Sequence, residues 1–145
     1  MIERRLSKKM VSYWHTLHNK ANALPKVVAY SHGAVEGTWP YCIQISAKKE
    51  PNVTTYVYEY VGKEIVKMLG KNPVGKQITT KVEFIPAGTM INKIGYVLEH
   101  PQPTIHEGQF SNKEGAQIKY RSCILPFSDN GESVTHFIIG ISWQK

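Results

Sequence analysis

TTYVYEYVGKEIVKMLGKNPVGKQITTK, residues 54–81, is the stretch that decides the fold, because its periodicity changes once, at a glycine. Before Gly62, aromatic residues occupy alternate positions, the pattern of a strand with two different faces: Tyr56, Tyr58 and Tyr60. After Gly62, apolar residues recur as on one side of a short helix: Ile65, Val66 and Leu69. Gly70 and Pro73 end that helix. The stretch predicts a strand that leads directly into a helix and a tight turn.

The turn after this helix nearly matches a phosphate-binding loop. Residues 70–76 read GKNPVGK, but Gln77 stands where such a loop needs Ser or Thr to hold magnesium. A P-loop also follows a strand and opens a helix, whereas this one follows a helix. Pro73 removes one of the backbone donors that would surround a phosphate. We therefore expect no nucleotide hydrolysis.

The composition is that of a single globular domain. The 145 residues are 41% hydrophobic and 20% charged, enough for one core but too short for two. No apolar run reaches the length of a membrane span, and no signal-peptide core follows the N-terminus, so we expect a cytoplasmic protein. Cys42 and Cys123 have no CxxC partner, which suits a reducing compartment and argues against a structural zinc site.

The positive charge is concentrated at the N-terminus. Residues 1–26 contain six basic residues and one acidic residue, which accounts for +5 of the formal net charge of +7. The remainder of the chain is close to neutral. A basic face on the body, which a nucleic-acid-binding domain would require, is therefore not expected.

Residues 3–22 have the pattern of an amphipathic helix that Pro25 ends. Large apolar residues recur on one side at spacings of three and four: Leu6, Met10, Tyr13, Trp14 and Leu17. Three interpretations remain open: a helix packed on its own domain, a dimerisation helix, or a helix on a membrane surface. We divide the chain into this helix, residues 1–24, and a body, residues 25–145. If the helix dimerises, the listed residues form the interface of a homodimer.

The remaining pattern predicts an α+β domain with five antiparallel strands. The strands are expected near residues 42–48, 54–61, 104–110, 117–126 and 134–143, separated by turns rich in Pro, Asn, Gly and Asp. Between the second and third strands lie the short helix after Gly62 and a longer helical stripe around residues 90–98 that Pro101 ends. We expect the helices to cover one face of the sheet.

This order and several short strings resemble the PAS domain, and within it the small single-domain PAS proteins common in alphaproteobacteria. The strings are YWHTL at 13–17 with Leu24-Pro25, YEYVG at 58–62, LG at 69–70 with PVGK at 73–76, and ILPFSDNG at 124–131 followed by FIIG at 137–140. The LG and PVGK strings resemble the glycine-shaped turn of that family, which explains the P-loop near-match. The sequence departs from the family at Glu59 and Lys63, where such proteins carry an arginine and a threonine.

The resemblance implies a PAS fold and a sensor or interaction module of bacterial signalling without enzymatic activity. It implies a small apolar pocket between the sheet and the helices that follow the second strand. Alternation then selects the candidate lining residues: Tyr56, Tyr58, Tyr60, Met68, Leu69, Ile91, Ile94, Leu98, Tyr120, Ser122 and Ile124. The same residues would form the core of any α+β domain. The implied partners are a small apolar ligand, a second copy of the chain and an unidentified signalling protein.

No catalytic set or metal site stands out, and the sequence requires no cofactor. His15 and His18 have helical metal-ligand spacing but no third ligand nearby. His100 ends the longer helix, where it is either an axial haem ligand, as in some PAS sensors, or a favourable positive group at a helix end. The Asn-Cys signature of the flavin-photoadduct branch is missing from the sequence.

Two competing functions come from other classes. In a nucleic-acid-binding domain, the tyrosine strand would be a stacking platform and the N-terminal helix a phosphate anchor. The RNP1 pattern of RNA-recognition sheets is missing, which argues against this alternative. A small-molecule enzyme would need an inward acidic residue, and only Glu59 and Glu107 lie in expected strands.

Overall fold

The computed structural model describes residues 5–30, 35, 37–78, 87–111 and 114–144. Within these ranges, the side chains of residues 87–91 and 110 are outside the description. None of the helices in the described ranges is both long and apolar enough to cross a membrane.

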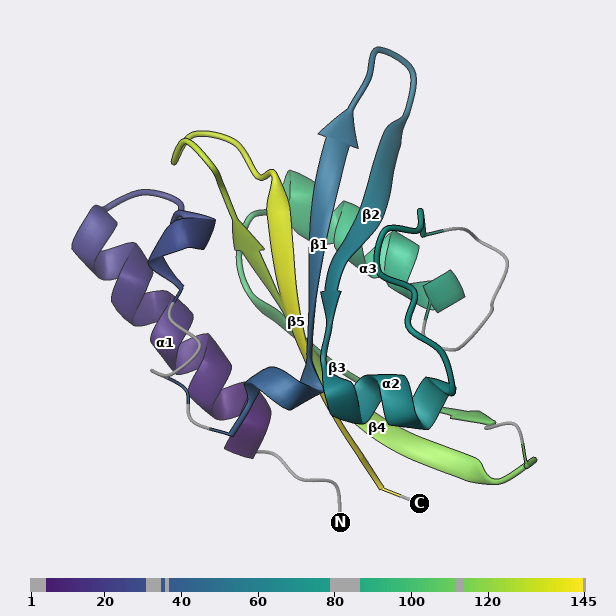
Figure 1. Ribbon diagram of the computed structural model, residues 1–145. Helices are drawn as coiled ribbons and strands as arrows, with labels where there is room; N and C mark the ends of the chain where they lie inside the picture. The colour runs from purple at the N-terminus through teal and green to yellow at the C-terminus, as the bar shows by residue number, and fades with distance from the viewer. Residues whose placement is uncertain (1–4, 31–34, 36, 79–86, 112–113, 145) are drawn as a thin grey trace.

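The described chain forms one five-stranded antiparallel sheet with the strand order β2-β1-β5-β4-β3 (Figure 1). The strands are β1 (Cys42–Lys49), β2 (Thr54–Val61), β3 (Thr104–Ser111), β4 (Gln117–Phe127) and β5 (His136–Gln144). The helices are α1 (Arg5–Ala21), α2 (Lys63–Leu69) and α3 (Ala87–Glu99), with 3-10 turns η1 (Val27–Ala29) and η3 (Trp39–Tyr41). The predicted α+β class, the five strands and the helices between the second and third strands are confirmed.

The stretch at residues 54–78 folds as its periodicity predicts. α2 begins directly after β2, and it ends at Gly70, whose φ of 79° lies in the left-handed region that glycine adopts without steric cost. The following loop then returns to β2. The Gly75 N–H donates to the Tyr58 carbonyl, and the Tyr58 N–H donates to the Lys76 carbonyl. These backbone groups pair with the strand, so the GKNPVGK string does not form a phosphate cradle.

A β-bulge in β2 changes which side chains face which side. Tyr58 pairs with Ile45 and Tyr60 pairs with Gln44, so Glu59 is the extra residue on the β2 side. A bulge shifts the alternation by one position. Tyr56 and Tyr58 therefore face one side of the sheet, and Tyr60 faces the other, where its ring stacks on Trp39 with 4.2 Å between centroids. The expectation that all three tyrosines share a face is wrong for Tyr60.

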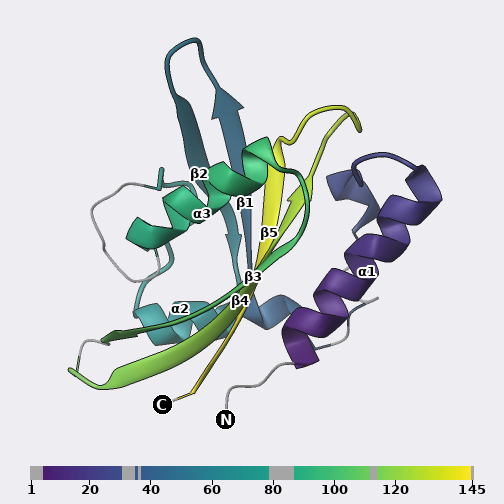
Figure 2. The same ribbon diagram turned by 180° about the vertical axis from the view of Figure 1, so that it is seen from behind.

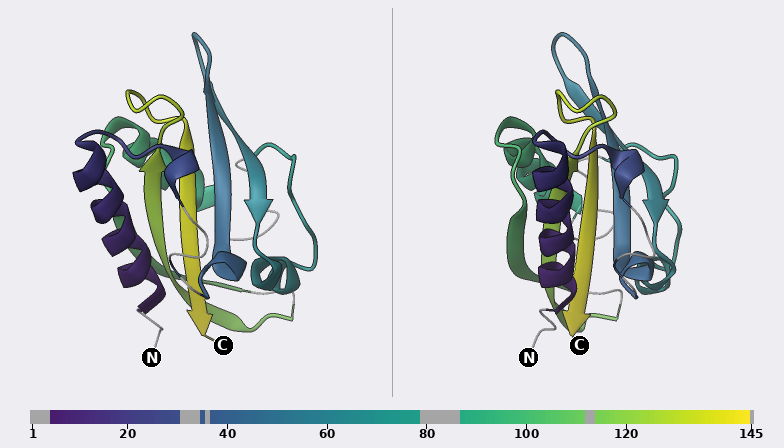
Figure 3. Two further views of the ribbon diagram at one scale, coloured as in Figure 1. Left: turned by 60° about the vertical axis from the view of Figure 1, so that its left-hand side comes forward. Right: turned by 90° about the vertical axis from the view of Figure 1, so that its left-hand side faces the viewer.

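Helices cover both faces of the sheet, not one as expected. The inner face, as we call it, packs against α2 and α3 through residues such as Ile65 and Ile94. The outer face packs against α1 through Leu6, Met10 and Trp14. Figure 3 shows α1 running along the sheet beside β5, and Figure 2 shows α3 lying across the opposite side. The chain thus has two apolar clusters separated by one sheet.

α1 is part of its own domain. Met10 and Trp14 are fully buried, and the Trp14 indole N–H donates to the Pro126 carbonyl at 2.7 Å. Gly140 of β5 lies directly below, where a Cβ atom would collide with the Met10 sulfur and come within 2.8 Å of Leu6. The interpretation of α1 as a helix packed on its own sheet is confirmed.

The residues proposed for a dimer interface are correspondingly used within the monomer. Leu6, Met10 and Trp14 are buried against the outer face, while Tyr13 and Leu17 are half-buried at its edge. For the three buried residues, the assignment to an intermolecular interface is wrong, because burial against the sheet satisfies the apolar stripe. Whether the chain forms a homodimer through another surface stays a prediction.

Candidate ligand site on the inner face of the sheet

The inner face brings together most of the residues that the sequence proposed as pocket lining. Buried in one cluster are Tyr56 and Tyr58 of β2, Leu69 of α2, Ile94 of α3, and Tyr120 and Ile124 of β4, with Met68 and Leu98 packed against it. Ser122 is buried on the same face of β4, since it lies between Tyr120 and Ile124 in the alternation. The side chain of Ile91 lies outside the described residues. Tyr60 does not belong to this face.

Two polar residues that the sequence reasoning missed lie at the same place. The Lys93 ammonium of α3 is 3.4 Å from the Tyr120 hydroxyl oxygen and 5.7 Å from the centroid of its ring. His106 of β3 pairs directly with Ser122 across the sheet and shares a 2.9 Å hydrogen bond with the Thr104 hydroxyl. The alternation of β3 could have identified His106, because residues 104 and 106 share a face with each other and with Gly108.

The electrostatics around Lys93 and His106 favour an anion or a hydrogen-bond acceptor. Burial lowers the pKa of His106, and the nearby Lys93 ammonium lowers it further. His106 is therefore a neutral imidazole near pH 7, with one nitrogen able to donate a hydrogen bond. Together with the Lys93 ammonium and the Tyr120 and Ser122 hydroxyls, it forms a small polar corner on an otherwise apolar face. We call Lys93, His106, Tyr120 and Ser122 the polar corner.

The two acidic residues in the expected strands do not reach this face. Glu59 is exposed on the outer side, where it accepts a hydrogen bond from Gln44 and lies 3.3 Å from the His136 ring nitrogen. Glu107 is exposed and pairs with Arg121. An inward carboxylate acting as a general acid or base is therefore not provided by either residue.

Both cysteines lie on the face opposite the polar corner. Cys42 and Cys123 are fully buried beneath α1, with their sulfurs 3.8 and 3.9 Å from the Met10 sulfur. A flavin photoadduct requires a cysteine beside the bound flavin, and these are the only cysteines of the sequence. A flavin on the inner face would be separated from both by the sheet. The chain therefore does not fit photoadduct chemistry.

Because the Cys42 and Cys123 thiols are buried, the chain is expected to be less stable in alkaline solution. Burial raises the pKa of Cys123 to about 11 and raises the pKa of Cys42 still further, so both remain protonated in the folded chain. In the unfolded chain they ionise near pH 8.5. The free energy of unfolding is thus expected to decrease from about pH 8.5 up to pH 11, by up to about 1.4 kcal/mol per pH unit per thiol. Urea unfolding across this range measures the slope.

The Cys123→Ala variant is the control, because tyrosine and lysine also ionise in alkaline solution. In this variant, the free energy of unfolding is expected to decrease less steeply with pH than in the parent chain. An equal slope in the variant and the parent chain would contradict the assignment to Cys123.

The histidines singled out as metal or haem ligands face away from the inner side. His100 is exposed at the end of α3, where its ring stacks on Tyr96 with 4.4 Å between centroids. His15 is exposed, and His18 stacks on Trp14 and contacts the Ala23 carbonyl. Within the described residues, no group of three His, Cys, Asp or Glu side chains could hold a metal ion. The position of His100 does not favour a haem ligand.

The tyrosines of β2 are not available to stack on nucleic-acid bases. Tyr56 and Tyr58 are 7% and 4% exposed, and α2 and α3 cover the face from which they project. Base stacking needs open aromatic faces on the sheet surface. The basic residues of α1 lie on the other side of the sheet from these tyrosines. The proposed platform is therefore wrong.

The fold resembles that of LOV domains, a branch of the PAS superfamily. The light-state structure of the blue-light photoreceptor Aureochrome1 LOV superposes with a TM-score of 0.53 at 10% identity, covering 75% of this chain and 84% of that one. A LOV domain studied with a flavin analogue gives 0.50 at 14% identity over 72% and 76%. The Cys71Ser mutant of Vivid gives 0.50 at 11% identity over 88% and 96%.

No family model matches the sequence, and no curated protein matches it either. At 10–14% identity the structural likeness establishes the fold alone. In this chain, α1 covers the outer face of the sheet and the polar corner lies on the inner face. The chain therefore has the α+β fold of PAS and LOV domains.

Proposed function

We propose that the chain is a PAS-type sensor or interaction module of bacterial signalling, without enzymatic activity, whose inner face binds a small and largely apolar ligand. The observation that carries the proposal is the polar corner within an apolar cluster. A few placed polar groups on an apolar wall are the usual composition of a small-molecule site. The ligand class is an apolar molecule with one acidic or hydrogen-bond-accepting group that meets Lys93 and Tyr120.

The sheet supplies a route from this site to the outer surface. Along β4, inward Ser122 and Ile124 alternate with outward Cys123 and Leu125, and the outward residues pack against α1. A ligand that shifts β4 on one face therefore acts on the packing of α1 on the other. Coupling of this kind requires that the ligand bind the two packing states of α1 with different affinity. Release or strengthening of α1 is the proposed output to a partner protein or a second copy.

Removal of the Lys93 charge is expected to weaken ligand binding at least tenfold, because a charge-assisted hydrogen bond on an apolar face is lost. The measurement is native mass spectrometry of the purified protein, which gives the fraction that carries a co-purified small molecule. We expect Lys93→Met and Tyr120→Phe to lower this fraction. Lys67→Met, which removes an exposed lysine of α2, is the matched control and should leave it unchanged.

Fatty and aromatic carboxylic acids, added to the purified chain, extend the experiment to protein that carries no ligand. The amide signals of residues 93, 106, 120 and 122 should shift in a two-dimensional ¹⁵N–¹H NMR spectrum. The proposal fails if Lys93→Met and Tyr120→Phe retain full ligand occupancy, or if no acid shifts the signals of the polar corner.

A further inference from the structure

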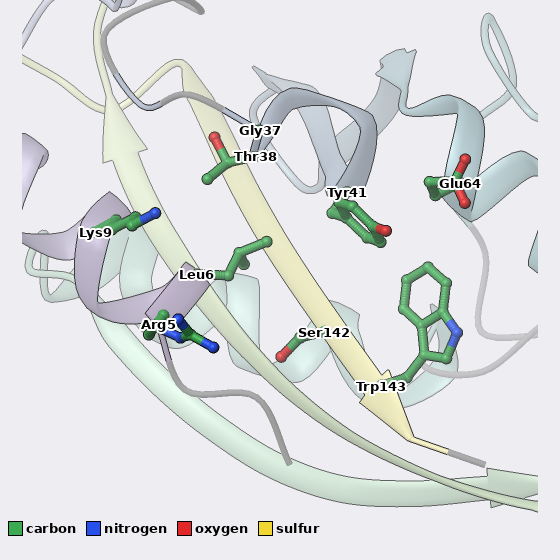
Figure 4. A pocket seen from close by; sticks show the side chains of 9 residues that line it. All are labelled: Arg5, Leu6, Lys9, Gly37, Thr38, Tyr41, Glu64, Ser142 and Trp143. Atoms are coloured by element: carbon green, nitrogen blue, oxygen red, sulfur yellow. The ribbon is translucent and has the colours of Figure 1, made fainter.

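A cleft opens at the junction of α1 with the end of β5. It is an open cleft of about 530 Å³, within the range of volumes that hold drug-sized ligands. α1 contributes Arg5, Leu6 and Lys9, and Tyr41 and Trp143 line the opposite side (Figure 4). Trp143 also packs against the inner-face cluster and pairs with Tyr120 across the sheet, but none of the four polar-corner residues lines the cleft.

The floor and one wall of the cleft are apolar or aromatic. Leu6 is 9% exposed between the two sides, and the Tyr41 and Trp143 rings lie 5.5 Å apart between centroids at an interplanar angle of 55°. Two tilted rings next to an aliphatic side chain form a surface on which a further ring packs edge-to-face or offset. This wall therefore favours a ligand with an aromatic body.

The charges of the cleft determine which polar group the ligand carries. Arg5 and Lys9 lie one helical turn apart on α1 and both line the cleft, so their positive ends share one side. The one acidic residue among the lining residues, Glu64, lies beyond Tyr41, and its carboxylate is 3.3 Å from the Lys67 ammonium. Among the lining residues, both positive charges lie on the α1 side, which favours an anionic group there.

Two of the three hydroxyls that line the cleft have their protons engaged. Thr38 donates to the Val35 carbonyl at 2.7 Å, and Ser142 donates to the Arg121 carbonyl at 3.4 Å. Neither of these two protons is available to a ligand. The Tyr41 hydroxyl lies on the side of the cleft away from α1, so an anion beside α1 is recognised by Lys9 and Arg5. We propose that this cleft binds a small carboxylate with an aromatic body, its ring on Tyr41 and Trp143 and its carboxylate beside Lys9 and Arg5.

A ligand bound in this cleft contacts both α1 and the sheet, and so stabilises the docked position of α1. The ligand contacts α1 on one side and β5 and the segment before β1 on the other, so it binds only when α1 is docked. A ligand with this requirement lowers the population of undocked α1 by a factor of 1 + [L]/Kd, about 100-fold at one hundred times the Kd. Hydrogen exchange of the α1 amides should slow by a similar factor if these amides exchange through undocking.

The test uses 4-phenylbutyrate and its neutral amide, 4-phenylbutyramide, which differ in charge at one end only. In ¹⁵N–¹H NMR titrations of the full chain, we expect the acid to shift signals of residues 5–9, 41 and 142–143, with at least tenfold tighter binding than the amide. Lys9→Met should weaken binding of the acid at least threefold and leave the amide unaffected. Trp143→Ala should weaken both, because it removes the ring surface they share.

Lys8→Met is the matched control, since Lys8 is an exposed lysine on α1 that does not line the cleft. It should leave the affinity for the acid unchanged. Equal affinities for acid and amide, an affinity for the acid that Lys9→Met leaves unaltered, or the absence of shifts at the cleft with 10 mM acid would each overturn the proposal. Shifts confined to the polar corner would also overturn it, and they would support the inner-face site instead.

Discussion

Replacement of Trp14 by alanine is expected to lower the free energy of unfolding by about 3–5 kcal/mol. Trp14 is fully buried against the outer face, so truncation removes its apolar contacts and leaves a cavity under α1. The variant also loses the indole N–H that donates to the Pro126 carbonyl, which leaves that buried carbonyl without this partner. Urea unfolding followed by circular dichroism measures the change, which is a large part of the stability of a typical domain.

Lys8→Ala is the control for this experiment, because Lys8 is exposed on the same helix. Its effect is expected to lie within about 0.5 kcal/mol. The measurement should be repeated at several protein concentrations. A loss of stability that is independent of concentration supports packing within the monomer, whereas a Trp14→Ala effect that disappears at low concentration would show that α1 contributes to an interface between chains.

Addition of a methyl group at Gly140 is expected to destabilise the chain by about 1–3 kcal/mol, the usual cost of an overpacked core. The new Cβ atom would collide with the Met10 sulfur and lie 2.8 Å from the Leu6 side chain, so α1 would have to move away from β5. Met10→Ala alone is expected to cost about 2–5 kcal/mol, because Met10 is fully buried.

The double variant Met10→Ala/Gly140→Ala distinguishes a steric conflict from a general sensitivity of β5. With the Met10 side chain shortened, space is available for the methyl group at position 140. The double variant should therefore lose less stability than the sum of the two single variants. A coupling of about 1 kcal/mol or more is expected for groups in direct contact. Strict additivity would show that Gly140 is not required for the close approach of α1.

Burial of the apolar stripe of α1 argues against the role of a dimer interface for this helix. A helix that carries most of the net charge and an apolar stripe is a reasonable candidate for a dimer interface. In the folded chain the stripe is buried against the outer face, while the charged Arg5 and Lys9 remain at the rim of a cleft. α1 is therefore better described as a cover docked on the outer face of the sheet.

The strands were predicted from the sequence to within two residues at each end. This precision has a local cause. Alternation of apolar and polar residues, followed by Gly, Pro, Asn or Asp, depends only on neighbouring positions, and antiparallel strands joined by short turns preserve it. The end of α2 at Gly70 was predictable for the same reason, since a left-handed residue there favours glycine.

The candidate site was predicted only in part. The apolar lining of the inner face follows from alternation, but the bulge at Glu59 moved Tyr60 to the other side, and no local signal marks a bulge that depends on the register with β1. Lys93 and His106 were missed because they come from separate elements that meet only when α3 lies over β3 and β4.

The sequence by itself determined the α+β class, the order and lengths of the strands, and the amphipathic character of α1, because these are properties of local periodicity. Only the tertiary structure decided that α1 covers the outer face, that both cysteines lie beneath it, and that a cleft remains between α1 and β5. An apolar stripe specifies that a helix must be buried, but it does not specify against what. That choice depends on complementary contacts between distant segments, such as the space above Gly140 that accepts Met10.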